Sequence, residues 1–198
     1  MKKYFLSLVA IAAMLFATSC QESLVEPQLA GPTTFTIEVP TQMETKADFG
    51  SAENVNQLLV EVYQVGTNKV IYQTVKSING STKVELNLIQ GQMYDILFWA
   101  QKENEYVQVD ADGAFSSLKT IALNCRNLNN DNGAAFFHAE KEFDDLGTSP
   151  TIYLRRPFAQ LNLGTTDKSL EPMTGKVTLT SSLITVKGVA THFNVYEG

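Results

Sequence analysis

Residues 94–100 read YDILFWA, and this stretch says more about the fold than any other part of the chain. Asp95 is the only residue that interrupts the apolar run. The run is too short to cross a membrane, which takes ~20 residues in a helix. Short apolar runs of this kind are typical of strands that are buried on both faces. We therefore expect residues 94–100 to form a strand with nearly all of its side chains in the core.

The segments on either side alternate between apolar and polar residues, which is the pattern of strands with one buried face. Residues 33–39 and 58–62 show this alternation, and residues 84–88 show it most regularly. Residues 52–59 are the one candidate for a short helix. Many short strands separated by turn residues predict an all-β fold, an antiparallel β-sandwich. Further strands are expected at 118–124, 135–143, 151–156, 158–163, 176–181 and 189–196.

Two short motifs predict turns between strands. Asn79-Gly80 tolerates the positive φ angles of a type I′ turn, so residues 69–77 and 82–89 are expected to form a β-hairpin. Residues 110–113 (DADG) resemble the start of a calcium-binding loop, but the further ligands that an EF-hand needs do not follow. We expect a hairpin turn there and no metal.

The N-terminus has the features of an export signal. Two lysines at positions 2 and 3 precede an apolar region, and residues 15–20 then read LFATSC. A positive start, a short apolar region and small residues before a cleavage point are typical of a secretory signal peptide. The order apolar, small, small, Cys resembles the bacterial lipobox, in which the cysteine receives a diacylglycerol and becomes the new N-terminus. The alternative is an ordinary cleaved signal followed by an incidental cysteine.

This interpretation divides the chain into three parts: a lipoprotein signal peptide at 1–19, a flexible tether at 20–32 that starts with lipidated Cys20, and one domain at 33–198. Pro and Gly residues in the tether discourage regular structure. The strand pattern at 189–196 runs almost to the last residue, so a second domain beyond it stays open as an alternative.

Charge and cysteine content exclude several classes of partner and site. The chain carries 21 acidic and 15 basic residues, a net charge of −6, which argues against nucleic acid or anionic headgroups as partners. Membrane attachment would then depend on the lipid at Cys20, where acyl chains contribute ~0.8 kcal/mol per buried CH2. With Cys20 lipidated, Cys125 has no partner, so a disulfide scaffold and a multi-cysteine zinc site are excluded.

Motifs for catalysis are lacking in the sequence. It contains no nucleophile elbow, no glycine-rich phosphate loop and no zinc-protease motif. A dyad of Cys125 with His138 or His192 is conceivable, but a loop thiol and two strand histidines explain these residues with fewer assumptions. Trp99, the only tryptophan, lies within the apolar run and is expected in the core rather than in a sugar-binding platform. We therefore expect a protein that is not an enzyme and needs no cofactor.

Residues 154–164 (LRRPFAQLNLG) are the most distinctive stretch of the chain. Pro157 cannot donate a hydrogen bond to a neighbouring strand, so it marks an edge, a bulge or a strand that changes sheets. Arg155 and Arg156 precede it, and Phe158 follows. Together with MYDILFWAQ (93–101), this motif resembles the N-terminal domain of fimbrillin-related lipoproteins of the Bacteroidales, and more narrowly a domain of unknown function in that group.

The resemblance implies a β-sandwich of Greek-key, transthyretin-like type, exported as a lipoprotein to the outer membrane and exposed at the cell surface. Related proteins are subunits, anchors or tips of type V pili. In such subunits a protease cuts after an Arg or Lys and removes the first strand, and a strand of the next subunit replaces it. Lys46-Ala47 occupies the corresponding place after residues 33–39, although an ordinary surface lysine in a loop is the simpler explanation of Lys46.

Two functions follow from these features. The first is a structural or adhesive surface lipoprotein of fimbrillin-like fold, whose partners would be the membrane, other fimbrillin-like subunits or surface ligands. The alternative is a glycan- or ligand-binding lipoprotein that uses the loops at 102–117 and 124–134.

Overall fold

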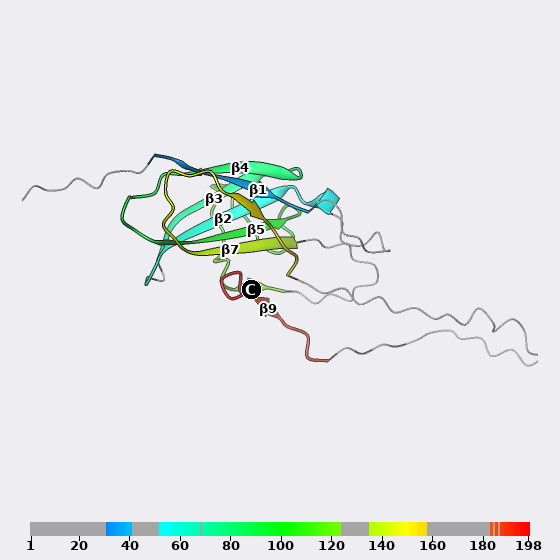
Figure 1. The fold of residues 1–198 in the computed structure, drawn as a ribbon. Helices are drawn as coiled ribbons and strands as arrows, with labels where there is room; N and C mark the ends of the chain where they lie inside the picture. The colour runs from blue at the N-terminus through cyan, green and yellow to red at the C-terminus, as the bar shows by residue number, and fades with distance from the viewer. Residues whose placement is uncertain are drawn as a thin grey trace, which may run out of the picture.

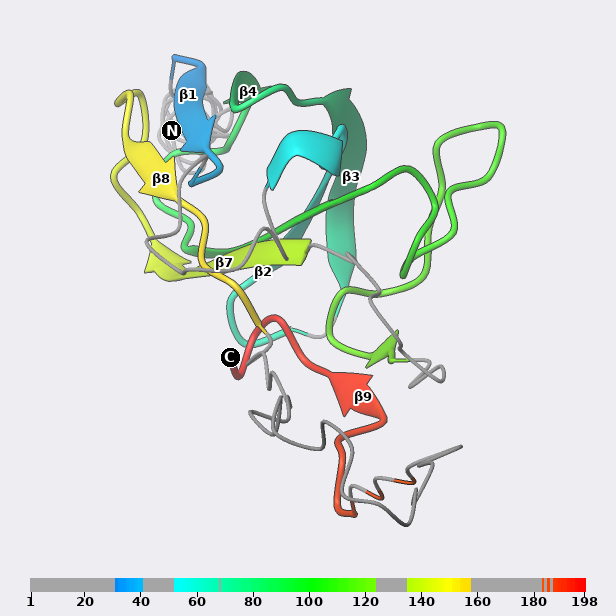
Figure 2. The same cartoon turned by 90° about the vertical axis from the view of Figure 1, so that its right-hand side faces the viewer.

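The protein is an all-β sandwich with three layers, as Figure 1 shows. A three-stranded sheet lies above a four-stranded sheet, and the C-terminal segment lies below (Figure 2). The computed structural model describes residues 31–40, 52–67, 69–123, 135–157, 183, 185 and 187–198.

The strand order in each sheet follows from the pairing of strands distant in sequence. The three-stranded sheet has the order β4-β1-β8 and consists of β1 (Thr33–Glu38), β4 (Ser81–Leu86) and β8 (Thr151–Tyr153). The four-stranded sheet has the order β3-β2-β5-β7 and consists of β2 (Gln57–Gln64), β3 (Val70–Ser77), β5 (Tyr94–Gln101) and β7 (Ala135–Phe143). All pairs are antiparallel except β1 and β8, which are parallel. A third, two-stranded sheet consists of β6 (Ile121–Ala122) and β9 (His192–Phe193).

The first hydrophobic core lies between the two larger sheets. Alternate residues of β1, β2, β4 and β5 face this core, as the period-2 patterns predict. Phe35 of β1 packs against Phe98 of β5, with ring centroids 5.7 Å apart, and against Phe143, at 5.1 Å. These contacts hold the three-stranded sheet on the upper face of the four-stranded sheet.

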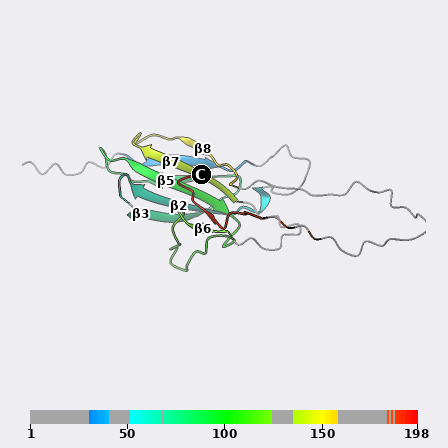
Figure 3. The ribbon, with the colours of Figure 1, turned by 90° about the horizontal axis from the view of Figure 1, so that it is seen from below.

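A second core covers the opposite face of the four-stranded sheet. Leu97 and Trp99 of β5 point into it and are fully buried, covered by residues 102–123 and the C-terminal segment 191–198. Figure 3 shows this segment crossing the sheet when the molecule is seen from below. Every residue of β5 is therefore buried, and the prediction of a doubly buried strand at 94–100 is confirmed.

The predicted hairpin of residues 69–77 and 82–89 is wrong. β3 and β4 follow one another in sequence, but β3 pairs with β2 and β4 pairs with β1 in the other sheet. Gly80 does adopt a positive φ of 73°, so the turn chemistry is as expected. β4 pairs with β1, so the turn at Gly80 connects a strand of one sheet to a strand of the other. Similar crossings link β1 to β2, β4 to β5 and β7 to β8, as in Greek-key sandwiches.

Other expected elements are shorter than the sequence indicates. The possible helix at 52–59 is a single 3-10 turn, η1 (Ala52–Asn54), and the strands expected at 118–124 and 189–196 shrink to β6 and β9. β6 and β9 cover one face of the four-stranded sheet. Their side chains pack there, although their backbones pair with each other over only two residues. The strand at 135–143 matches β7, and the turn at 110–113 is present. The strands expected at 158–163 and 176–181 lie outside the described residues.

Gly80 provides a test of the crossing between sheets. Its carbonyl accepts a hydrogen bond of 2.8 Å from the N–H of Val39, and its positive φ disfavours any side chain. We expect Gly80→Ala to lower the free energy of unfolding by about 1–2 kcal/mol in urea denaturation. Gly31→Ala is the control, since a Cβ there meets no atom within 4 Å. Equal effects of the two substitutions would contradict the assigned crossing.

Candidate functional site

β1 is the central strand of the three-stranded sheet and is bonded along both edges. It pairs with β4 over six residues and with β8 over three. The N–H of Thr34 donates to the carbonyl of Thr148 at 3.0 Å, and the N–H of Thr36 donates to Pro150 at 2.9 Å. The N–H of Leu154 donates to the carbonyl of Glu38 at 2.9 Å. Removal of β1 would therefore leave two unpaired strand edges.

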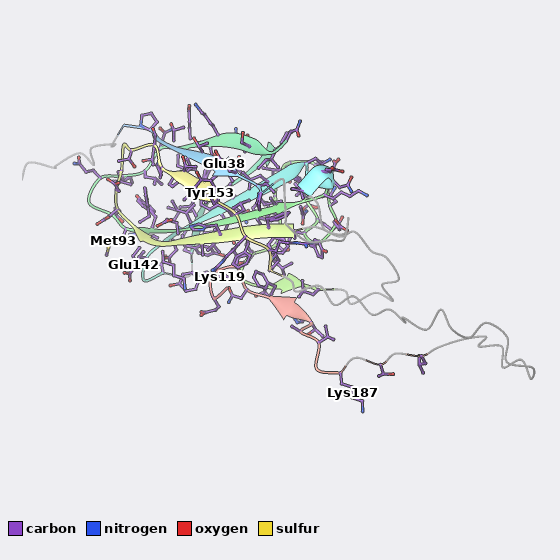
Figure 4. The ribbon with its side chains drawn as sticks, turned by 45° about the vertical axis from the view of Figure 1, so that its right-hand side comes forward. Glu38, Met93, Lys119, Glu142, Tyr153 and Lys187 are labelled. Atoms are coloured by element: carbon purple, nitrogen blue, oxygen red, sulfur yellow. The ribbon has the colours of Figure 1, made fainter. Side chains whose placement is uncertain are left out.

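The inward side chains of β1 fill pockets in the first core. Phe35 and Ile37 are fully buried, and Val39, just beyond the strand, is 4% exposed. Burial of each such side chain contributes about 1.5–3 kcal/mol. Together they approach the whole stability of a typical domain, which is about 5–15 kcal/mol. The sandwich without β1 would thus need another strand in the same place. Figure 4 shows Glu38 and Tyr153 on this sheet.

The 154–157 motif lies where the chain passes from one sheet to the other. β8 pairs with β1, and two residues later Arg155 forms backbone hydrogen bonds of 2.8 and 3.0 Å with Phe137 of β7. The guanidinium carbon of Arg155 lies 4.7 Å from the ring centroid of Phe137, and that of Arg156 lies 5.8 Å from the ring of Phe136. Because Phe136 and Phe137 belong to opposite cores, the two arginines hold the edge of β7 from both faces.

Gln101, at the end of β5, fixes the loop that covers the second core. It is fully buried, and its Oε1 accepts hydrogen bonds from Nε1 of Trp99 at 2.9 Å and from the N–H of Val107 at 3.0 Å. Its Nε2 donates to the carbonyl of Val107 at 2.7 Å and to Oε1 of Gln57 at 2.8 Å. This residue was not among those expected to be important, although a glutamine directly after YDILFWA was a visible signal.

Glu61 has the same function at the middle of β2. Its carboxylate is fully buried and accepts hydrogen bonds from the N–H of Leu118 at 2.8 Å and from Nε2 of Gln73 at 2.9 Å. The hydroxyl of Ser117 donates to the same carboxylate at 3.3 Å. These bonds attach residues 117–118 to the sheet, so the buried carboxylate is explained as a structural group. Its signal was an acidic residue inside the apolar stretch LLVEVY.

Two tyrosines and two lysines form a cluster beside Glu61. Nζ of Lys119 lies 3.9 Å from the ring centroid of Tyr63 and 4.8 Å from that of Tyr196, and Nζ of Lys141 lies 4.2 Å from Tyr196. Figure 4 shows Lys119 on the side of the four-stranded sheet away from β1. Burial raises the pKa of Tyr63, and the negative charge of Asp95 is the main cause that raises the pKa of Tyr196. The cluster binds the C-terminal segment to the sheet.

The two histidines do not lie together. His138 is on β7, where its Nε2 lies 3.1 Å from Oε2 of Glu140 and its ring contacts Phe98 of the first core. His192 is on β9, which packs on the opposite face of the sheet. Within the described ranges, no three His, Cys, Asp or Glu side chains are placed to hold a metal ion.

Several residues singled out from the sequence lie outside the described residues: Cys20, Lys46, Ala47, Cys125, Phe158 and the loop at 124–134. The other suggested loop, 102–117, packs over fully buried Trp99, whose ring stands edge-on to Tyr106 at 5.8 Å. In the part of the chain that is described, no helix is long and apolar enough to span a membrane.

Replacing Gln101 tests its role beneath the covering loop. Gln101→Leu leaves Nε1 of Trp99 and the backbone of Val107 without their buried partners, at a cost of about 1–3 kcal/mol for each group. We expect the free energy of unfolding to fall by about 3 kcal/mol or more in urea denaturation. Gln90→Leu, at an exposed position between β4 and β5, should change it by less than ~0.5 kcal/mol. A loss for Gln101→Leu no larger than for the control would refute this role.

The raised pKa of Tyr63 predicts the dependence of stability on alkaline pH. The folded protein holds the phenol proton more tightly than the unfolded chain, whose tyrosine pKa is about 10. The stabilisation is complete below that pH and is lost as the pH rises above it. Wild-type stability should therefore fall more steeply above pH ~10 than that of Tyr63→Phe. Equal slopes for wild type and Tyr63→Phe would count against burial of this phenol.

Comparisons with known proteins place the chain in a family. A search of curated proteins gives no significant match. Among solved structures, the chain is similar to a protein of Bacteroides thetaiotaomicron described as a candidate polysaccharide-binding protein (DUF1812), with 17% identity and a TM-score of 0.40. The match covers 63% of this chain and 47% of that one, so the chain spans about half of that protein's length. The model of a family of unknown function (DUF6562) matches residues 27–198, and the chain therefore belongs to this family.

Proposed function

We propose that the protein is a non-enzymatic lipoprotein of the outer membrane with a structural or adhesive role at the cell surface. The observation that carries this proposal is the position of β1. The strand that directly follows the N-terminal tether is bonded on both edges and buried along one face, so a lipid on Cys20 would be joined to the centre of the fold.

The place where β1 starts supports this arrangement. The first residue of β1 pairs with the last residue of β4, so the tether enters at the end of the sandwich that carries the connection from β4 to β5. Met93 and Glu142 lie at this end (Figure 4). We infer that this end faces the membrane. The net charge of −6 gives the protein no electrostatic attraction to anionic lipid, which leaves the acyl chains as the means of attachment.

The resemblance to fimbrillin-related lipoproteins adds a possible mechanism of assembly. If a protease cut after Lys46, β1 and the lipid would leave together, and a strand from another subunit would fill the vacated place by β-augmentation. The large cost of removing β1 means that an unfilled sandwich would not persist. We propose that Lys46 stays uncut in this protein, so that Cys20 is a permanent attachment point.

The alternative, that ligand binding through the loops at 102–117 and 124–134 is the main function, finds less support. Of the two suggested loops, residues 102–117 are fixed to the sheet by Gln101 and by contacts with Trp99. Their buried side chains serve the second core.

Membrane fractions test the proposal directly. We expect a single lipidated species in the outer-membrane fraction of wild type, which still contains residues 33–39 by mass spectrometry. Cys20→Ala should release the protein from the membrane, because the lipid would be lost. Lys46→Ala should leave the band unchanged, as should Lys83→Ala, at an exposed position on β4. A heat-sensitive ladder that disappears only in Lys46→Ala would show strand exchange and overturn the permanent attachment; wild type that stays soluble would refute the lipoprotein.

A further inference from the structure

An open depression of about 560 Å³, lined by both polar and apolar groups, lies where the chain crosses from β3 to β4. It is at the end of the sandwich where β2 and β4 begin and β3 and β5 end, opposite to the end where β1 starts. Its position places it away from the tether. Asn56 and Gln57 line it from the start of β2, Lys76 from the end of β3, and Glu103 from the loop after β5.

Two side-chain amides in this depression have fixed orientations. Oδ1 of Asn56 accepts a hydrogen bond of 2.8 Å from the N–H of Glu103. Oε1 of Gln57 accepts bonds from Nε2 of Gln101 at 2.8 Å and from the N–H of Asn104 at 3.2 Å. Backbone N–H groups only donate, so the oxygen of each amide must be the atom that faces them.

The nitrogen of each amide is therefore available to a ligand. Among the described residues, nothing accepts a hydrogen bond from Nδ2 of Asn56 or from Nε2 of Gln57. Neighbouring amides with anchored oxygens give the depression a pair of donors whose positions are set before a ligand arrives, which reduces the entropic cost of binding.

The remaining lining groups favour a neutral ligand that both donates and accepts hydrogen bonds. Lys76 and Glu103 carry opposite charges, which balance, and Ser77 and Ser81 add hydroxyls. An anionic ligand would meet the carboxylate of Glu103, and a cationic one would meet the ammonium of Lys76. Vicinal hydroxyls of a sugar accept from the amides and the lysine while they donate to the carboxylate.

The apolar part of the lining fits the same class of ligand. Val75 is partly buried and offers a small apolar surface among the polar groups, whereas Ile78 is 3% exposed and belongs to the first core. The C–H groups of a pyranose ring can pack on such surfaces. Since none of the lining residues is aromatic, binding would depend on hydrogen bonds.

We propose that this depression binds a neutral glycan through one or two pyranose residues. The site is independent of lipid attachment and of strand exchange, and it gives the adhesive role a ligand class. Because hydrogen bonds to solvent-exposed hydroxyls replace bonds to water, a single site should bind weakly, with a Kd of about 1 mM. Many copies on one surface would raise the effective affinity for a polymer.

Amide NMR of the isotope-labelled full chain in detergent tests this site, with maltotetraose, cellotetraose and mannotetraose as probes. At least one of them should shift the side-chain NH2 signals of Asn56 and Gln57, and the signals of Asn87 and Gln90 should stay in place. Absence of any shift at Asn56 and Gln57 with all three sugars overturns the proposal.

A pair of double variants tests the donors. Asn56→Asp with Gln57→Glu keeps the oxygens that hold residues 103–104 but replaces both NH2 groups with acceptors, so the Kd should rise about tenfold or more. Asn87→Asp with Gln90→Glu makes the same chemical changes at exposed positions at the other end of the sandwich and should leave the Kd unchanged. Equal affinity of wild type and the first variant refutes the site. If a thermal melt shows that this variant is already unfolded, the chemical-shift changes of the wild-type side-chain amides on addition of sugar decide whether the site exists.

Discussion

Burial of β5 on both faces is the constraint on which the rest of the structure depends. A strand whose eight residues are all buried needs cover above and below, and the chain provides two different kinds of cover. Above it lies a second sheet, formed by strands from three distant parts of the sequence. Below it lie short, irregular segments and the C-terminal residues. The two cores are therefore separate, and β5 with its neighbours β2 and β7 is the layer that they share.

The irregular cover explains the buried polar residues. A segment that packs on a sheet without joining it leaves backbone groups that need hydrogen-bond partners away from water. Gln101 provides them for residues 106–107, and Glu61 provides them for residues 117–118. Each of these side chains stands at a position where strand alternation would place an apolar residue. Their polarity is thus a consequence of how the lower face is covered, and needs no catalytic explanation.

The parts of the fold that rest on local pattern could be predicted from the sequence. The doubly buried strand at 94–100 follows from its continuous apolar run, and the strands at 33–39 and 135–143 follow from local sequence pattern. The prediction of a hairpin at Asn79-Gly80 was wrong because a turn motif determines the backbone angles but not the sheet that the next strand joins. Likewise, the pattern at 118–124 and 189–196 shows which side chains are buried, and not whether the backbone pairs. The depression at Asn56 and Gln57 could not be predicted, since its residues come from three strand ends and a loop that meet only in the fold.

The two ends of the sandwich have different chemistry, and β1 runs from one end to the other. Its first residue receives the tether, and its last residues lie near the crossing where the depression opens. This arrangement requires β1 and β5 to be integral parts of one cooperative unit. Hydrogen exchange followed by mass spectrometry on the intact protein measures this directly. Peptides from 33–38 and 94–101 should exchange slowest and at similar rates, while 102–117 exchanges faster. Rapid exchange of 94–101, at the rate of the covering loop, would contradict the doubly buried strand on which the account rests.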